Sequence, residues 1–378
     1  MMTTLPNPLT ARKLLLATAV AACLLTSGCA ASFQTQTAEI ANAGPSSARF
    51  AYVANVYDST ISMYTVSSAG LWTPTSPATV AAGPQPEAIT VDSQGKFAYV
   101  CNIGNSTIGM YAINQSTGVL SPLSPATAPT GAMPQDFTLH PSGNFAYSAN
   151  TSDGTVTVFS VNKATGQLTP TATVPVPGYN VANPVAVTVS PSGMFLYVVA
   201  QYVEIYSIDQ TTGGLTILPE TYTYPGVRPF KLTFDPTGLF AFIPDNGSNN
   251  LYEFAANPTT GALTALASSP VAAGNQPSGV ALNPAGNFIY VSDRLGNSIS
   301  SFDVAGSTGQ LTPLSANAAT NVNGPWPIQF DPSGKIVYIL NEAGFVTSYT
   351  ANPDGSLTYL SSVATGKIPA SFAIVPLQ

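Results

Sequence analysis

The chain has 378 residues, of which only 7% are charged, and its formal net charge is −7. An acidic chain with few basic residues is poorly suited to phosphate backbones or anionic lipid headgroups, which argues against nucleic-acid binding and electrostatic membrane binding. The 33 prolines, 31 glycines and 17 tyrosines, with hardly any Glu and Lys in helical patterns, predict an all-β chain rich in turns.

The N-terminal segment has the features of a signal peptide. Arg12 and Lys13 give it a positive start, and the apolar run LLLATAVAACLLT that follows is too short to span a bilayer comfortably. The run leads into LTSGC, which resembles the lipobox of bacterial lipoproteins, where the cysteine, here Cys29, carries the lipid. The alternative is an ordinary secretory signal that is cleaved near Ala30 or Ala31.

These features predict the organisation of the first 49 residues. We expect residues 1–28 to be a lipoprotein signal peptide and residues 29–49 to be a polar tether. The protein is then exported and held in the bacterial envelope only by the lipid on Cys29. By the enteric pattern, Ala30 after the cysteine, where Asp would retain the protein, indicates the outer membrane.

The cysteines predict neither a disulfide nor a metal site in the body of the chain. Cys23 leaves with the signal and Cys29 carries lipid, so Cys101 alone remains, and we expect it to be a small buried residue. The common nucleotide-binding and hydrolase motifs are absent as well, so we expect no metal and no cofactor. Ca²⁺ bound through Asp and Asn oxygens stays open as an alternative, although the sequence has no EF-hand loop.

Two ladders of residues recur along the rest of the chain at intervals near 48 residues. The first is an aromatic residue that opens a YVAN-like motif, at Tyr52, Tyr99, Tyr147, Tyr197, Phe242, Tyr290 and Tyr338. The second is a glycine two residues before a large apolar residue, at Gly70, Gly118, Gly166, Gly213, Gly261, Gly309 and Gly355. Two independent ladders of seven members indicate a sevenfold repeat.

Each repeat has the pattern of four short strands. In the second repeat PEAITV, KFAYVCN, TIGMYAI and VLSPL alternate apolar and polar residues, and turn residues separate them. Four strands in 40–50 residues are typical of a propeller blade. The first repeat lacks its leading strand, which IPASFAIVPLQ at the C-terminus supplies. We therefore predict that residues 50–378 form a seven-bladed β-propeller of four-stranded blades, closed when the last strand pairs into the first blade.

The repeat units identify a family. SVNKATGQLTP, SIDQTTGGLTIL and AANPTTGALTAL, with HPSGNFAYSAN and NPAGNFIYVSD, resemble the bacterial seven-bladed lactonase family, which is related to YVTN-repeat propellers. The resemblance covers the whole body of the chain and implies a lactonase activity of the 6-phosphogluconolactonase type. Family members taken as lactonases carry Arg-His after the proline of the inner strand. Here none of the post-proline pairs is Arg-His, and only Asn341-Glu342 resembles the Asn-Glu of the family.

His140, the only histidine, is predicted to be structural. In the other repeats its slot holds Asp, Asn or Ser, which cap the turn that follows. The inner strand runs from its proline at the mouth of the channel to this turn, about 20 Å away at about 3.3 Å per residue. A general base must reach its substrate, so His140 lies at the wrong end of the strand for catalysis at the mouth.

Candidate site residues stand at the starts of the inner strands. The third slot, counted from the proline as the first, is small or proline in five repeats but holds Asp136 and Lys231 in the other two. A charge at a crowded position costs free energy unless it is paired or solvated, so the two either pair across the channel or mark a binding site. The slot before them and nearby loops complete the candidate ligand-binding set, which is Glu87, Gln135, Asp136, Arg228, Lys231, Trp326 and Glu342.

Three functions remain open. The first is an envelope-anchored, monomeric propeller that binds a small molecule or an envelope protein at the channel mouth without chemistry. The second is a divergent lactonase that opens a sugar-type lactone, with Glu342 or Asp136 as base and Arg228 or Lys231 as electrophile. The third is a structural or adhesive envelope protein. A phosphorylated lactone fits an acidic, exported chain less well, because such metabolites are cytosolic.

Overall fold

The computed structural model describes residues 48–177, 183–218, 223, 225–315 and 317–376. The predicted signal peptide, Cys29 and the predicted tether as far as residue 47 lie outside the described residues. In the described part, the first strand begins at Ala48, two residues before the predicted start of the propeller. No helix of the described part is long and apolar enough to cross a membrane.

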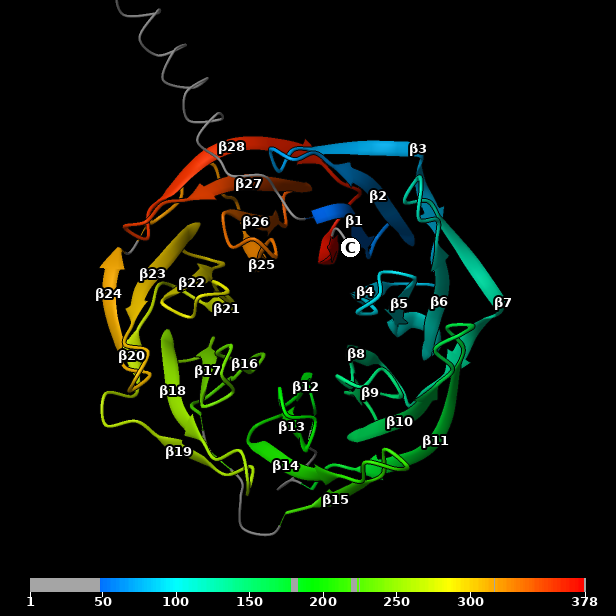
Figure 1. Ribbon diagram of the computed structural model, residues 1–378, viewed down its shortest axis with the longest axis horizontal. Coiled ribbons are helices and arrows are strands. Elements are labelled where there is room, and N and C mark those ends of the chain that lie inside the picture. The colour runs from blue at the N-terminus through cyan, green and yellow to red at the C-terminus, as the bar shows by residue number, and fades with distance from the viewer. Residues whose placement is uncertain (1–47, 178–182, 219–222, 224, 316, 377–378) are drawn as a thin grey trace, which may run out of the picture. The chain divides into compact units, whose positions relative to one another are not determined.

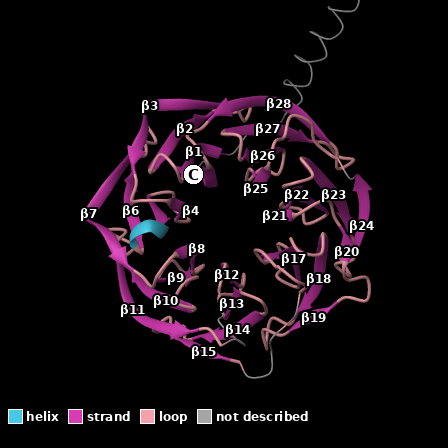
Figure 2. Ribbon diagram, turned by 180° about the vertical axis from the view of Figure 1, so that it is seen from behind, coloured by secondary structure: helices cyan, strands magenta, loops and turns pink. Residues whose placement is uncertain are grey.

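Seven antiparallel sheets form a ring of blades, as Figures 1 and 2 show from opposite sides. Blade 1 consists, from the centre outwards, of β29 (Pro369–Pro376), β1 (Ala48–Asn55), β2 (Thr60–Val66) and β3 (Trp72–Ala81). Blade 2 consists of β4 (Pro86–Val91), β5 (Phe97–Asn102), β6 (Thr107–Ile113) and β7 (Leu120–Pro129), with the 3-10 helix η1 (Ile103–Asn105) between β5 and β6. Blade 3 consists of β8 (Pro134–Leu139), β9 (Phe145–Asn150), β10 (Thr155–Val161) and β11 (Leu168–Pro175).

The other four blades repeat this order. Blade 4 consists of β12 (Ala186–Val189), β13 (Phe195–Val199), β14 (Val203–Ile208) and β15 (Leu215–Ile217). Blade 5 consists of β16 (Thr233–Phe234), β17 (Phe240–Asp245), β18 (Asn250–Ala256) and an outer strand split into β19 (Leu263–Ala265) and β20 (Val271–Ala272). Blade 6 consists of β21 (Pro277–Leu282), β22 (Phe288–Asp293), β23 (Ser298–Val304) and β24 (Leu311–Ser315). Blade 7 consists of β25 (Pro325–Phe330), β26 (Ile336–Asn341), β27 (Phe345–Ala351) and β28 (Leu357–Ala364).

The predicted closure of the ring is confirmed. The C-terminal strand β29 pairs antiparallel with β1, with Tyr52 opposite Ala373 and Val53 opposite Phe372. Blade 1 is therefore built from both ends of the propeller, and β29 takes the innermost place that the first strand of each other blade takes. This pairing leaves β1 without an open edge towards the channel.

The two sequence ladders meet in space between neighbouring blades. The hydroxyl of Tyr147 in blade 3 donates to the carbonyl of Gly213 in blade 4 at 3.0 Å, and Tyr52, Tyr99 and Tyr197 make the same bond to the glycine of the next blade. Gly213 has a φ of +73°, and a Cβ there would lie 2.5 Å from Phe145 of blade 3. The glycine thus supplies both a left-handed turn and a close approach, which explains why the two ladders keep the same period.

His140 has the structural role that its slot predicts. Its side chain is buried, and Nε2 donates to the carbonyl of Gly193 in the next blade at 2.8 Å. Nδ1 accepts from the backbone N–H of Ser142, inside its own turn. In the equivalent slot, Asp92 accepts from the backbone N–H of Phe97. The histidine holds a turn together and joins blade 3 to blade 4.

Candidate functional site

A cavity of about 280 Å³ opens at the face where the inner strands begin, which we call the mouth face. Both slots that follow the inner-strand prolines line it in all seven blades. The residues are Glu87, Ala88, Gln135, Asp136, Val185, Ala186, Phe230, Lys231, Ser278, Gly279, Trp326, Pro327, Ala370 and Ser371. The starts of the inner strands therefore form the wall of one central cavity, and His140 is not part of that wall.

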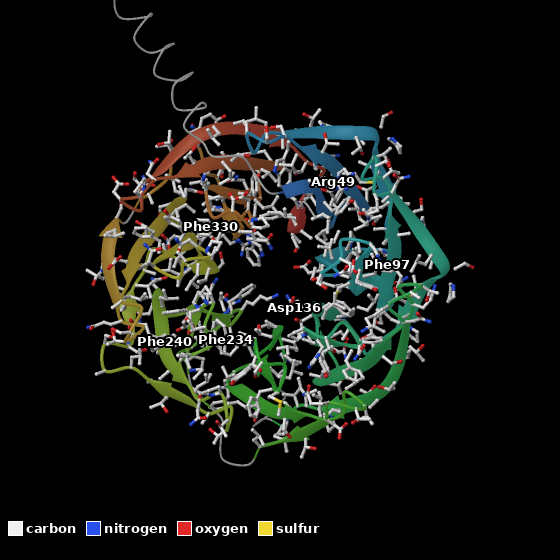
Figure 3. All side chains as sticks on the ribbon, in the orientation of Figure 1. Arg49, Phe97, Asp136, Phe234, Phe240 and Phe330 are labelled. Atoms are coloured by element: carbon white, nitrogen blue, oxygen red, sulfur yellow. The ribbon has the colours of Figure 1, made fainter. Side chains whose placement is uncertain are left out.

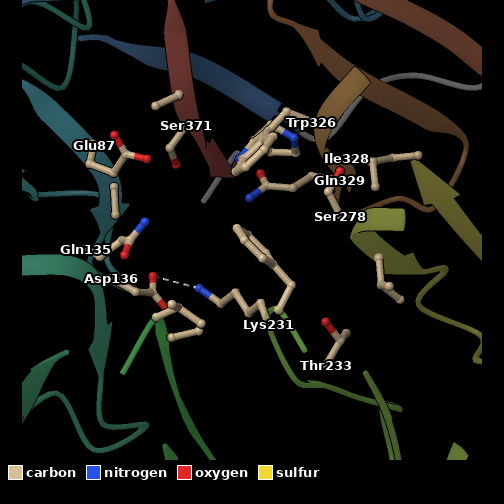
Figure 4. Close-up of a pocket in the computed structure, with 18 residues that line it drawn as sticks. Glu87, Gln135, Asp136, Lys231, Thr233, Ser278, Trp326, Ile328, Gln329 and Ser371 are labelled. Atoms are coloured by element: carbon tan, nitrogen blue, oxygen red, sulfur yellow. Dashed lines mark hydrogen bonds and ion pairs between the residues drawn. The ribbon is translucent and has the colours of Figure 1, made fainter. Parts of the chain in front are cut away.

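Asp136 and Lys231 pair inside this cavity. Lys231 Nζ lies 3.0 Å from Asp136 Oδ1, and Figure 4 shows the lysine reaching across towards the carboxylate. The other oxygen of Asp136 accepts from the backbone N–H of Val187 at 3.1 Å. Asp136 faces the central opening in Figure 3 but is only 8% exposed, whereas about half of the Lys231 side chain is exposed. The two residues thus form an ion pair between blades 3 and 5, as the first alternative expects, and both line the cavity.

Glu87 lies on the same side of the cavity as Gln135 and Asp136 (Figure 4). Half-burial of its carboxyl group removes water from the charged form and raises the pKa of Glu87 to about 7. Gln135 is fixed through its side-chain oxygen, which accepts from the hydroxyl of Thr151 at 2.8 Å. This side of the cavity presents one carboxyl group poised near neutral pH, one oriented amide and one carboxylate that is already paired.

Aromatic and amide groups form the opposite side. The rings of Phe230 and Trp326 meet edge to face, with centroids 5.1 Å apart and planes at 89°. Gln329, in β25, also lines the cavity and lies beside Trp326 in Figure 4. The sequence did not single out Gln329, because it lies two residues beyond the slots in which the repeats were compared.

Arg228 and Glu342 are not among the residues that line the cavity. Arg228 is exposed, and its backbone N–H is held by the buried carboxylate of Asp245. Glu342 forms an ion pair with Arg294 and borders a separate, shallow depression on the mouth face. The structure therefore brings together five of the seven predicted ligand-binding residues and leaves these two outside. Arg294 was missed, although it is one of only eight basic residues that follow Lys13.

Several of the Asn and Asp residues at the ends of the second strands cap loops. Asn55 accepts from the N–H of Gly366, and Asn341 accepts from the N–H of Asn323, so each holds the loop that leads into the inner strand of its own blade. Asp293 does the same for Gly274, and burial raises its pKa to about 6. In the described part of the chain, no three His, Cys, Asp or Glu side chains are grouped so that they could hold a metal ion.

Known structures share the fold. A protein from Bacteroides fragilis that is provisionally described as a 6-phosphogluconolactonase has a TM-score of 0.78 at 20% identity, over 87% of this chain and 98% of that one. The periplasmic gluconolactonase of Pseudomonas aeruginosa has a TM-score of 0.72 at 22% identity, over 88% and 99%. A protein from Lactobacillus plantarum has a TM-score of 0.73 at 22% identity, over 87% and 99%. No curated protein matches the chain.

The family is settled by sequence. The profile described as "Lactonase, 7-bladed beta-propeller" matches residues 43–183, 177–274 and 265–374, which together span the propeller. These are the same stretches that contain the tyrosine and glycine ladders and the cavity-lining slots. The chain therefore belongs to the seven-bladed β-propeller lactonase family.

Proposed function

We propose that the central cavity binds a small, hydroxyl-rich ring without a phosphate group, such as a sugar or a sugar lactone. The observation that carries this proposal is the two-sided wall of one cavity. Glu87, Gln135 and Asp136 offer acceptors and donors on one side, and Trp326 offers aromatic surface on the other (Figure 4). Phe230, whose ring meets that of Trp326, adds to this surface. Sugars combine hydroxyl groups with an apolar face, which suits such a wall. At about 280 Å³ the cavity lies at the small end of the range of about 300–1,000 Å³ for ligand pockets, which fits a single ring.

The charges of the cavity wall argue against a phosphorylated ligand. Lys231 is the one basic residue among the residues that line it, and its ammonium group is already paired with Asp136. The ionised form of Glu87 then leaves the wall with a net negative charge. A phosphate group, with a charge of about −1.5 to −2 at neutral pH, would meet two carboxyl groups and no unpaired cation there. This supports an unphosphorylated ligand, in line with the gluconolactone named for the Pseudomonas aeruginosa protein.

Calorimetric titration of the purified protein tests this proposal. The probes are D-glucose, gluconolactam as a neutral lactone analogue that does not hydrolyse, and glucose 6-phosphate. We expect the neutral rings to bind at least about tenfold more tightly than the phosphate, which corresponds to about 1.4 kcal/mol. Trp326→Ala should abolish binding, whereas Asp303→Asn, which removes an exposed carboxylate on β23, should not change it. Tighter binding of the phosphate, or no binding of any ring, would contradict the proposal.

Hydrolysis of a lactone is the second candidate, and the raised pKa of Glu87 is the observation that favours it. A carboxyl group with a pKa of about 7 can take a proton from water and return it at neutral pH. Water would attack the lactone carbonyl while Glu87 accepts its proton, and the ring C–O bond would break as the leaving oxygen takes that proton. Lys231, held in the same wall by Asp136, would donate a second N–H of its ammonium group to the negative oxygen of the intermediate. The product is the open hydroxy acid.

A lactone panel separates the two candidates. If the protein is a lactonase, kcat/KM should rise with pH through about 7 as Glu87 ionises, and Glu87→Gln should reduce turnover to the spontaneous rate. Asp303→Asn should retain turnover, because Asp303 is exposed on β23 and does not line the cavity. Binding of neutral rings without turnover would leave the cavity as a binding site only.

We also propose that the protein is an envelope lipoprotein anchored through Cys29. The proposal rests on the lipobox-like LTSGC and the charged and apolar segments before it. Radiolabelled palmitate should be incorporated by cells that express the full chain and not by cells that express Cys29→Ala. Fractionation should move the Cys29→Ala protein from the membranes to the soluble exported fraction. Unlabelled protein in the membrane fraction would contradict the lipid anchor.

A further inference from the structure

Trp326 is the largest ring in the cavity wall, and its main chain is firmly held. It stands near the start of β25 between two prolines, and its carbonyl oxygen accepts from the buried hydroxyl of Ser292 in blade 6. The indole itself is half-buried and meets Phe230 edge to face on the cavity side. The contacts of the main chain do not fix the orientation of the indole, so a further contact to the ring itself is needed.

Arg294 provides that contact from outside the cavity wall. It follows β22 in blade 6, and its backbone N–H donates to the carbonyl of Gln276 at 3.0 Å. Its guanidinium carbon stands over the Trp326 ring, 4.4 Å from the ring centroid. Arg294 is not among the cavity-lining residues, so it packs on the indole from behind. Such a cation over an indole is an attractive contact, and Trp is the ring that forms it best.

Glu342 holds the guanidinium in this place. Arg294 Nη2 and Glu342 Oε1 form an ion pair, and both side chains are about one-third exposed. Glu342 is itself fixed to the segment that carries Trp326, because its backbone N–H donates to the carbonyl of Gly324 at 3.0 Å. Gly324 also makes room for it, since a Cβ at Gly324 would lie 3.1 Å from Glu342 Cβ.

The buried Nε of Arg294 adds a free-energy cost to this arrangement. Within the described residues this N–H has no hydrogen-bond partner, which costs free energy that the ion pair and the indole must offset. Without the Glu342 carboxylate, the guanidinium of Arg294 would lower its free energy by turning towards water, which can accept from its N–H groups. From this geometry we infer that Arg294 and Glu342 are positioning residues that set the orientation of Trp326, and so select ligands with a ring whose apolar face can stack on the indole at the proposed site. The inference rests on the proposed function for its ligand part only.

The fluorescence of Trp326 tests the positioning role without any ligand. The chain has two tryptophans, and the other, Trp72, is buried in the core. In a Trp72→Phe background, Arg294→Met and Glu342→Gln should lower the limiting anisotropy of Trp326 and increase its quenching by acrylamide. If that background does not fold, the difference between each variant and the same variant with Trp326→Phe isolates the signal. Unchanged anisotropy and quenching in both folded variants would overturn the inference.

A matched control and a ligand readout complete the test. Lys367→Met removes another cation that stands over an aromatic ring on the mouth face, 5.6 Å from the ring centroid of Tyr57, and it should leave the Trp326 signal unchanged. Affinity for gluconolactam should fall by about fivefold or more in Arg294→Met, the scale of a lost cation–π contact, and should be partly retained in Arg294→Lys. A mobile indole with unaltered affinity would overturn the selection of ligands. A mobile indole in a protein that binds none of the rings would overturn the proposed function and leave the positioning role standing.

Discussion

Replacement of Glu87 by Gln should stabilise the protein at high pH and hardly affect it at low pH. Burial raises the pKa of Glu87 from 4.5 to about 7 in the folded chain. When folding raises the pKa of a carboxyl group, the folded protein loses stability as the pH rises from the pKa in the unfolded chain to the pKa in the folded chain. In this pH range the group ionises in the unfolded chain but stays protonated in the folded one. The rise of this pKa from 4.5 to about 7 corresponds to about 3 kcal/mol of stability, lost between about pH 4.5 and pH 7. Glu87→Gln should therefore increase the free energy of unfolding by about 3 kcal/mol at pH 8 and by almost nothing at pH 4.

Urea denaturation of both proteins at pH 4 and pH 8, followed by tyrosine fluorescence and circular dichroism, measures this difference. Asp303→Asn serves as the control, because it removes a carboxylate that is exposed on β23. The reasoning is refuted if Glu87→Gln changes the free energy of unfolding by the same amount at both pH values. It is also refuted if Glu87→Gln has no stabilising effect at pH 8 while the denaturation slope stays unchanged.

Three further predictions concern the blades and the cavity wall. Tyr147→Phe should lower the free energy of unfolding by about 1 kcal/mol because it removes a buried hydrogen bond, whereas Tyr290→Phe should leave it unchanged or raise it, since the buried Tyr290 hydroxyl has no partner in the described residues. Lys231→Met should cost about 1–2 kcal/mol by leaving Asp136 unpaired, and Asp136→Asn in the same chain should recover part of this loss, both in urea denaturation. His140→Asn should cost about 1 kcal/mol through the lost inter-blade hydrogen bond and leave ring binding in calorimetry unchanged.

The fold could be predicted from the sequence because its repeating residues have one geometric role each. A tyrosine such as Tyr147 and a glycine such as Gly213 belong to different blades, yet the bond between them recurs from blade to blade, so both ladders keep one period. The outer strands follow the repeat less closely. In blade 5 the turn of Leu266–Ser269 separates β19 from β20, and the side chain of Ser269 accepts from the N–H of Glu253 in the gap. An outer strand faces solvent on one side, so less packing fixes its pattern.

The position of the cavity could also be predicted, but its supporting contacts could not. A slot at a fixed distance from the start of an inner strand points to the same place in every blade, so all residues of the two slots after the prolines line the cavity. Arg294 and Glu342 occupy the same repeat position in neighbouring blades, directly after Asp293 and Asn341, but the repeat does not show that their side chains pair with each other beside Trp326. The family's Asn-Glu pair led to Glu342 as a candidate base, whereas its carboxylate is bound to a guanidinium behind Trp326.

Burial of a carboxyl group does not by itself mark a site in this propeller, as a comparison of Glu253 and Glu87 shows. Glu253 is fully buried and its pKa is raised by burial, but it accepts from the N–H of Leu311 at 2.8 Å and from the hydroxyl of Ser268. The sulfur of Met63 accepts the equivalent N–H of Leu120 between blades 1 and 2, so Glu253 fills a structural position. Within the described residues, Glu87 has no such donor, and burial alone sets its pKa. A half-buried carboxyl group without an internal partner, on the wall of a cavity, is the arrangement that a ligand hydroxyl or an attacking water would complete.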